Sequence, residues 1–252
     1  MNKLYGGIDL HGNNSVVVVL DEADQVLYQK RLPNEVAQIL PQLAPFRAQL
    51  QGLVVESTYN WYWLVDGLQE AGYVVHLANP AAIQQDAGLK YTNDDSDARW
   101  LAHLLRLEML PTGYIYPKED RAIRDLLRKR SQLVRQKTAN LLSIPNLLTR
   151  NTGQAMKSNQ IKQLTPAKVR ELVALPEHAL ALEVTVAVMQ HLAEQITQVE
   201  RAVHARVQLR PAFQSLLTVP GIGQTLALTI MLETGEIHRF PTVGQFASLE
   251  FK

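Results

Sequence analysis

The sequence predicts an α/β domain at the N-terminus followed by an all-helical region. In the N-terminal part, short apolar segments with strand character alternate with helical patterns, whereas after Pro117 the periodicity is purely helical. Of the 252 residues, 46% are hydrophobic and 19% are charged, which is typical of a folded globular chain. A large domain, or two smaller ones, is therefore expected.

Several classes of protein are disfavoured by composition. Polar and charged residues such as Asp9 and His11 interrupt the N-terminus before the apolar core of a secretory signal could form, and no apolar run approaches the length of a membrane span. The absence of cysteine excludes disulfides, thiolate nucleophiles and Cys-ligated zinc. We therefore expect a cytoplasmic protein without a membrane segment.

The predicted elements of the N-terminal part follow a recognisable order. Three strands separated by short polar turns come first, at 3–11, 15–21 and 25–32. Helices and strands then alternate, with helices at 35–50 and 61–71 and strands at 52–57 and 73–79. An antiparallel meander followed by βαβ units is the element order of an RNase H-like fold.

A long amphipathic helix is predicted after Pro117. Eight positions between 123 and 148 keep a four-three spacing, and six of them are Ile, Leu or Val. Pro145 is expected to kink or end this helix, so its strongest part runs from Glu119 to about Ile144. A second heptad-like seam follows at 189–203, and the two helices could form an antiparallel pair or a dimerising coiled coil.

Positive charge is concentrated in residues 121–150. This segment holds eight basic residues and one acid, a local charge of +7, whereas the whole chain is +1 and the remainder is therefore −6. Such a stripe is expected of a protein that binds a phosphate backbone, although a solvated helix face is the commoner explanation of a single charge run. The basic residues are Arg121, Arg124, Arg128, Lys129, Arg130, Arg135, Lys137 and Arg150.

Four acidic residues form a candidate metal centre. Asp9 lies in the first predicted strand and Glu56 ends an apolar strand, where an ionised carboxylate is costly unless something compensates it. Asp94 and Asp97 open a helix, and residues three apart share one helix face. Hard oxygen ligands from several elements suit Mg²⁺ or Mn²⁺ in phosphodiester chemistry.

Each of these residues also has a simpler interpretation. Asp94 could cap its helix, Asp9 could open a tight turn, and Glu56 could pair with a buried basic side chain. His11 is interpreted as a neighbour of Asp9 rather than as a ligand. An aromatic cluster could stack nucleic-acid bases, but rings beside a strand end more often fill the core, and this second interpretation is favoured. Its members are Tyr59, Trp61, Tyr62 and Trp63.

Several motifs together resemble DEDD-type insertion-sequence transposases. They are Gly-Ile-Asp-Leu-His at 7–11, Val-Val-Glu-Ser at 54–57, Asn-Pro at 79–80, Asn-Asp-x-x-Asp-Ala at 93–98, Leu-Thr-Val-Pro-Gly-Ile-Gly at 217–223, Phe-Pro-Thr at 240–242 and Phe-Ala-Ser at 246–248. The resemblance spans nearly the whole chain. It implies a RuvC-like domain whose Asp9, Glu56, Asp94 and Asp97 hold divalent metal, a coiled coil that assembles protomers, and a DNA recombinase guided by a structured bridge RNA.

The segment at 220–223 has a physical interpretation of its own. Gly221 and Gly223 at a turn entering a helix would let backbone N–H groups approach a phosphate, although an ordinary interhelical turn explains them equally well. The family's serine nucleophile lies beyond the Phe-Ala-Ser block, and Ser248 does not match it. We therefore expect a C-terminally truncated form that lacks this serine, whose apolar residues between Leu226 and Phe246, including Leu228 and Met231, are half of a core.

The expected organisation has three parts: a RuvC-like catalytic domain at 1–115, a helical coiled-coil region at 116–208, and an incomplete helical C-terminal transposase domain at 209–252. The expected function is that of a DNA transposase or recombinase with DNA, guide RNA and a second protomer as partners. Alternatives are a non-catalytic nucleic-acid-binding scaffold, a RuvC-like nuclease and, ranked last, a sugar-kinase or actin-like ATPase. The last class needs a second glycine-rich phosphate hairpin, whereas residues 110–210 read as helical.

Overall fold

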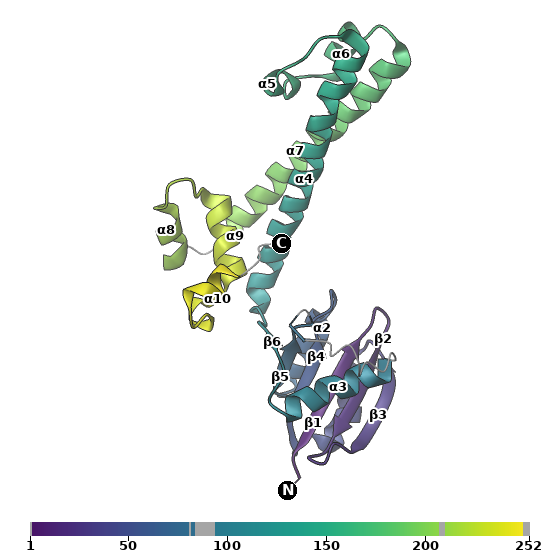
Figure 1. Cartoon of the computed structure of the whole chain (residues 1–252), viewed down its shortest axis with the longest axis vertical. Coiled ribbons are helices and arrows are strands. Elements are labelled where there is room, and N and C mark those ends of the chain that lie inside the picture. The colour runs from purple at the N-terminus through teal and green to yellow at the C-terminus, as the bar shows by residue number, and fades with distance from the viewer. Residues whose placement is uncertain (1, 81, 84–93, 207–209, 249–252) are drawn as a thin grey trace. The chain divides into compact units, whose positions relative to one another are not determined.

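The computed structural model describes residues 2–80, 82–83, 94–206 and 210–248 (Figure 1). The chain divides into two compact units, residues 1–115 and 116–252. Within the described residues, no helix is both long and apolar enough to cross a membrane.

The first unit is built on a six-stranded sheet of order β3-β2-β1-β4-β5-β6. β1 (Leu4–Leu10), β2 (Asn14–Leu20) and β3 (Val26–Pro33) form an antiparallel meander, which confirms the three strands predicted first. β4 (Leu50–Glu56) pairs parallel with β1, and β5 (Val75–Ala78) pairs parallel with β4. The short β6 (Thr112–Gly113) runs antiparallel to β5.

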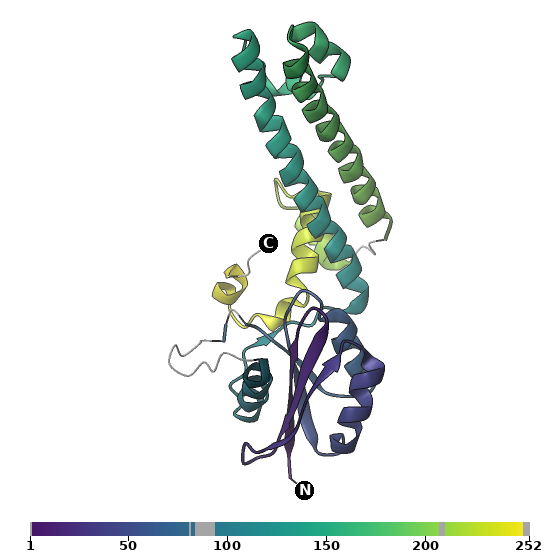
Figure 2. The same cartoon turned by 90° about the vertical axis from the view of Figure 1, so that its right-hand side faces the viewer.

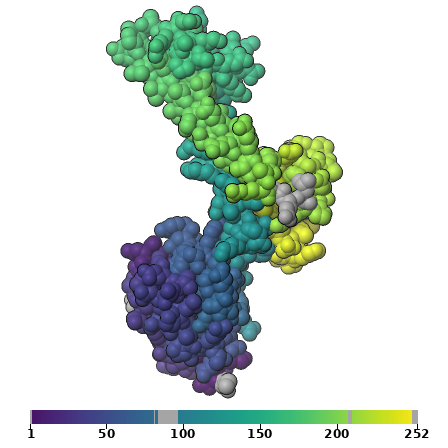
Figure 3. Space-filling view, turned by 180° about the vertical axis from the view of Figure 1, so that it is seen from behind, coloured from purple at the N-terminus to yellow at the C-terminus, as the bar shows by residue number. Residues whose placement is uncertain are grey.

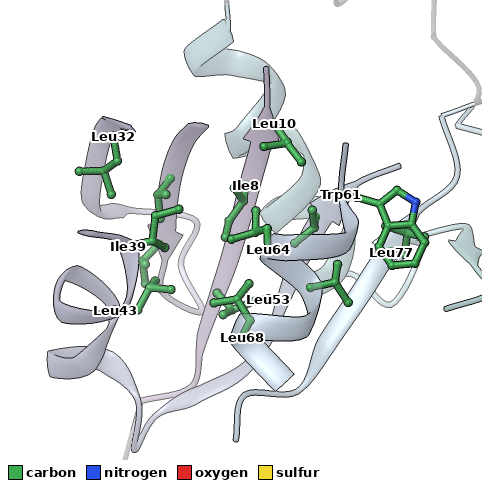
Figure 4. Close-up of a cluster of buried hydrophobic side chains, with 14 of the residues drawn as sticks. Ile8, Leu10, Leu32, Ile39, Leu43, Leu53, Trp61, Leu64, Leu68 and Leu77 are labelled. Carbon is green, nitrogen blue, oxygen red and sulfur yellow. The ribbon is translucent and has the colours of Figure 1, made fainter. Parts of the chain in front are cut away.

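Helices cover both faces of this sheet (Figure 2). α1 (Val36–Leu43) and α2 (Tyr62–Glu70) pack on one face, and their Ile39, Leu43, Leu64 and Leu68 form the main core with strand residues such as Ile8 and Leu53 (Figure 4). α3 (Asp94–Arg106) packs on the other face through Ala98, Leu101 and Ala102. A sheet covered on both sides buries every side chain of a central strand, which explains the unbroken apolar run 16–20 of β2.

The predicted helix at 35–50 is shorter than expected. α1 ends at Leu43 and is followed by a single 3₁₀ turn, η1 (Ala44–Phe46). Pro45 lacks the backbone N–H that would donate to the carbonyl of Pro41, so the α-helical pattern loses a hydrogen bond at this point.

The described part of the second unit consists of helices. The long helices α4 (Lys118–Thr152) and α7 (Pro176–Arg206) lie side by side (Figures 1 and 2), and α7 forms one side of the pair (Figure 3). They run antiparallel, because Leu127 of α4 shares a cluster with Val203 of α7, while Ile144 shares another with Leu182. The short helices α5 (Ser158–Ile161) and α6 (Pro166–Leu172) pack at one end of the pair.

The expectation that Pro145 could end the helix is wrong, because α4 continues to Thr152 and is capped by Gly153 at φ 69°. The residues on either side of the proline explain this. Ile144 and Leu148 are fully buried against α7, and their burial outweighs the one helical hydrogen bond that a proline removes.

The C-terminal helices α8 (Pro211–Leu217), α9 (Gln224–Thr234) and α10 (Val243–Ala247), with the 3₁₀ turn η2 (Ile237–Arg239), complete the second unit. Leu228 and Met231 of α9 are buried with Leu127 and Val203 of the long helices. The expectation that Leu228 and Met231 are half of an uncovered core is therefore wrong for these two residues, whereas Leu226 is exposed.

Candidate functional site

Asp9 and Glu56 lie at the carboxyl ends of the adjacent parallel strands β1 and β4. Ile8 is paired in register with Val55, so Asp9 and Glu56 each follow a paired residue. Ile8 and Val55 point into the core under α1 and α2, and successive side chains of a strand alternate between faces. Asp9 and Glu56 are therefore neighbours on the opposite face of the sheet, the face that α3 covers.

The amino end of α3 is directed towards these strand ends. Ala98 and Ala102 of α3 lie directly over Gly7 of β1, and Leu105, further along α3, lies over Gly52. Gly52 is paired with Tyr5, nearer the beginning of β1, so α3 runs antiparallel to β1. The first turn of α3, which carries Asp94 and Asp97, consequently lies towards the end of β1 that carries Asp9.

The structure thus brings two of the four predicted acids together on one face and places the helix that carries the other two over the same face. The side chain of Asp97 is exposed, and that of Asp94 lies outside the described residues. Among the side chains that are described, no group of three His, Asp or Glu residues is close enough to hold a metal ion. The four-carboxylate centre thus stays a prediction.

Asp9 is the buried member of the candidate site. It is 3% exposed, and its Oδ2 lies 3.2 Å from Nε2 of His11. A buried carboxylate needs compensating positive charge or hydrogen bonds, which a divalent cation and a histidine can both supply. With Glu56 beside it, the donor set consists of hard oxygen atoms, and such a set suits Mg²⁺ or Mn²⁺.

His11 contacts Asp9 directly, which the sequence analysis did not predict. The residue is two positions from Asp9 at the end of a strand, so both side chains leave the backbone on the same side. This spacing was a signal in the sequence for a direct contact rather than for mere proximity along the chain.

Two asparagines hold the loop that follows β1. Nδ2 of Asn34 and Nδ2 of Asn60 both donate to the backbone carbonyl of His11, at 2.9 and 3.0 Å. Ser15 and Thr58 in turn donate their hydroxyls to the side-chain oxygens of these asparagines, at 2.7 and 2.8 Å. The network fixes the position of His11, and sequence reasoning missed both asparagines.

The aromatic cluster after β4 divides into core and surface. Trp61 is 7% exposed, and Tyr62 and Trp63 pack against the same core, so the core interpretation is confirmed for these three. It is wrong for Tyr59, which is 87% exposed. Tyr59 precedes the first turn of α2 and therefore does not share the face of that helix that packs on the sheet.

The basic stripe of α4 also divides between two environments. Arg121 and Arg124 are buried instead of lying on a nucleic-acid-binding surface, because this face of α4 is turned towards the C-terminal helices. Arg124 and Arg128 both bind Glu233 of α9, with contacts of 2.7 Å, and Arg130 donates to Glu200 of α7 at 2.7 Å. Lys129 and Arg135 are exposed and Lys137 is half-buried.

Gly221 and Gly223 lie in the turn between α8 and α9. Gly221 has φ 89°, a left-handed conformation that favours glycine, and Gly223 is the N-cap of α9. No heavy atom lies within 4 Å of a Cβ built at either position, so the backbone of this turn is open to approach. The geometry accounts for an interhelical turn, and phosphate binding there stays a prediction.

Comparison with protein families gives two matches. Residues 6–152 match the sequence profile of DEDD transposases of the IS110 type. Residues 213–249 match that of the transposases of the IS116/IS110/IS902 family. No curated protein matches the chain. The first match covers more than half of the sequence, including Asp9, Glu56, the first turn of α3 and all of α4.

Proposed function

Because the chain belongs to the IS110 family of DEDD transposases, and is therefore a DNA transposase or recombinase, we propose that it cleaves and transfers DNA strands at a metal-dependent centre. Four carboxylates would form this centre: Asp9, Glu56, Asp94 and Asp97. The observation that carries the proposal is the placement of Asp9 and Glu56 side by side on the face of the sheet that α3 covers. We also propose that the first unit is an RNase H-like, RuvC-like domain, for which the central position of β1 in the sheet is support.

Divalent metal bound there would stabilise the attacking and leaving oxygens of a phosphodiester during strand cleavage. Asp9 and Glu56 would bind the metal from the sheet, and Asp94 and Asp97 would bind it from α3. His11 would orient Asp9, since it contacts the Oδ2 atom and its own backbone is fixed by Asn34 and Asn60.

The proposed partners are DNA, a structured guide RNA and a second protomer. The nucleic-acid surface would use the cations of α4 that are not buried, together with the open turn at Gly221 and Gly223. These cations are Arg128, Lys129, Arg130, Arg135 and Lys137. Leu180, Val184 and Val188 are exposed along one face of α7, which supports assembly of protomers through the helical region, residues 116–208. Residues 209–252 would form a C-terminal transposase domain.

Mn²⁺ binding by variants of the full chain tests the metal centre. Replacing Asp9 by Asn or Glu56 by Gln removes one negative ligand with little change in size, so we expect the Mn²⁺ affinity to fall at least about tenfold. The exposed Glu35→Gln is the matched control, because it removes the same charge outside the site. Metal-free DNA binding should stay unchanged in all three variants.

An unchanged Mn²⁺ affinity in Asp9→Asn would overturn the metal centre. It would favour the alternative of a nucleic-acid-binding scaffold without catalytic acids, which needs α4 but not Asp9. If the chain were a RuvC-like nuclease without strand transfer, the same metal dependence would be expected. Analysis of the DNA products separates the two functions, because only a transposase forms joined strands in addition to cleaved ones.

A further inference from the structure

A pocket lies between the first half of α4 and α9, which pack beside each other in the second unit (Figures 1 and 2). On α4 its lining residues recur at helical spacing, so they share one face of the helix. Two leucines contribute to its lining. Its polar lining consists of Arg124, Arg128, Ser131, Arg135, Thr229 and Glu233.

The charge of this pocket is strongly positive. Three guanidinium groups face a single carboxylate, Glu233, which leaves a formal excess of two positive charges. Arg124 and Arg128 share that carboxylate, whereas Arg135 is exposed at one end of the lining. A pocket with this excess attracts an anion and repels a cation.

Two of the three arginines of the pocket, Arg124 and Arg128, are held in place before any ligand arrives. Glu233 accepts from Nε of Arg124 at 2.8 Å, and from Nε and Nη2 of Arg128 at 2.7 and 3.0 Å. The guanidinium of Arg124 also lies 3.8 Å from the centre of the Tyr116 ring, whose hydroxyl donates to the carbonyl of Glu233 at 2.7 Å. Fixed guanidinium groups lose little conformational entropy on binding.

We infer that this pocket binds one phosphate group of a nucleic-acid backbone. The inference rests on the proposed function, because that function supplies the phosphodiester. Planar guanidinium groups match the oxygen atoms of phosphate in pairs, so Arg135 and the exposed part of Arg128 are the residues that contact it. Arg124 and Glu233 position Arg128 and do not themselves reach the ligand.

The position of the pocket between α4 and α9 gives the phosphate contact a second role, which is to position the nucleic acid. Glu233 links α9 to α4 across 109 positions of sequence, so a phosphate bound by Arg128 lies beside the region of the chain that matches the second transposase profile without contacting it. A backbone phosphate bound at a fixed place sets the register of the nucleic acid without reading its bases.

The test uses the full chain with inorganic phosphate and with duplex DNA as probes. Arginine Nε–H resonances in NMR spectra report on the pocket, and salt-dependent fluorescence anisotropy reports on DNA binding. Arg135→Gln removes the exposed contact without uncovering a buried charge, and Arg201→Gln removes the same charge from an exposed site on α7.

Five results are expected together. Phosphate shifts the Arg128 and Arg135 signals of the wild type saturably, and duplex DNA competes with it. Arg135→Gln weakens phosphate binding about tenfold and lowers the dependence of log K on log salt by about 0.9. Arg201→Gln leaves phosphate binding unchanged.

Non-saturable phosphate shifts in a wild type that still binds DNA would overturn the pocket and leave the proposed function standing. Saturable phosphate binding that DNA does not displace would assign the pocket to free phosphate or a nucleotide, and would also overturn the inference. A wild type that binds no DNA at all would overturn both the pocket's role and the nucleic-acid part of the proposed function.

Discussion

Asp24 shows how a single side chain fastens two elements. It lies in the turn between β2 and β3 with φ 65°, and it contacts three basic residues of α3. Its Oδ1 lies 2.7 Å from Nδ1 of His103 and 3.3 Å from Nε of Arg106, and Arg99 contacts Oδ2. Burial raises the pKa of Asp24, but the hydrogen bond and the positive charges of His103 and Arg106 outweigh it, so the pKa is lowered.

Asp24→Asn should destabilise the first unit at neutral pH by about 1 kcal/mol, because the ion pairs are partly exposed. Asparagine tolerates a positive φ, so the turn itself is kept. A carboxyl whose folded pKa lies below its unfolded value of 3.8 stabilises the fold above that pH, and this contribution is lost as the pH falls through the folded pKa. The difference between the two proteins should therefore shrink in acid.

Urea unfolding at neutral and acidic pH measures this difference, with the exposed Glu22→Gln as the control. An equal loss of stability at both pH values would show that the charge of Asp24 is not what matters.

Gly7 is a single residue of β1 whose missing side chain allows the helix α3 to pack closely on the strand. A Cβ at this position would collide with the backbone carbonyl of Ala98 and lie 2.9 Å from the backbone N of Ala102. Both are helix backbone atoms, so α3 itself would have to move.

Gly7→Ala should therefore lower the free energy of unfolding by about 2 kcal/mol, in the range of other overpacked cores. Because α3 carries Asp94 and Asp97, the same change should weaken Mn²⁺ binding. Gly113→Ala is the matched control, since its Cβ would meet ordinary contacts of 3.5 Å or more. If Gly7→Ala matched Gly113→Ala in stability and in Mn²⁺ affinity, the close packing of α3 on β1 would not be required.

At the scale of elements, α4 keeps a helical path that its own sequence disfavours. Pro145 removes one helical hydrogen bond, to the carbonyl of Leu141, and its neighbours Ile144 and Leu148 keep the helix in place through burial. The packing with α7 thus overrides local propensity.

Pro145→Ala should stabilise the second unit by about 2 kcal/mol, because it restores the missing hydrogen bond and adds the best helix former. Thermal unfolding followed by circular dichroism measures the change. The exposed Leu142→Ala, one turn away on the same helix, should have little effect. Should Pro145→Ala destabilise the chain, the proline ring would itself be part of the packing.

The difference between local sequence pattern and long-range packing explains what could be predicted from the sequence. Periodicity within a segment predicted the strands of the meander, their order before the βαβ units, and the long helix after Pro117. It could not reveal that Arg124 faces Glu233, because the two are 109 positions apart and nothing local links them. For the same reason, the asparagines that hold His11 were missed, one lying 23 and the other 49 positions away.

At the scale of the whole molecule, charge and core both follow the division into two units. Residues 1–115 hold seven basic and thirteen acidic residues, a formal charge of −6, and residues 116–252 hold eighteen and eleven, a formal charge of +7. Each unit also has hydrophobic clusters of its own, with Ile8 and Leu64 in the first and Leu182 and Leu228 in the second. A segment with its own core can fold by itself.

Separate fragments 1–115 and 116–252 should consequently divide the proposed activities. An acidic fragment with Asp9 and Glu56 should bind Mn²⁺ but repel duplex DNA, whereas a basic fragment with the cations of α4 should bind duplex DNA without metal. Circular dichroism first establishes that each fragment is folded, and calorimetry with Mn²⁺ and anisotropy with DNA then measure the two affinities. DNA binding by 116–252 should weaken steeply with salt, because each phosphate contact releases counterions. If a folded 116–252 failed to bind DNA while the full chain bound it, the nucleic-acid surface would need residues of the first unit, and the assignment of DNA binding to the helical unit alone would be wrong.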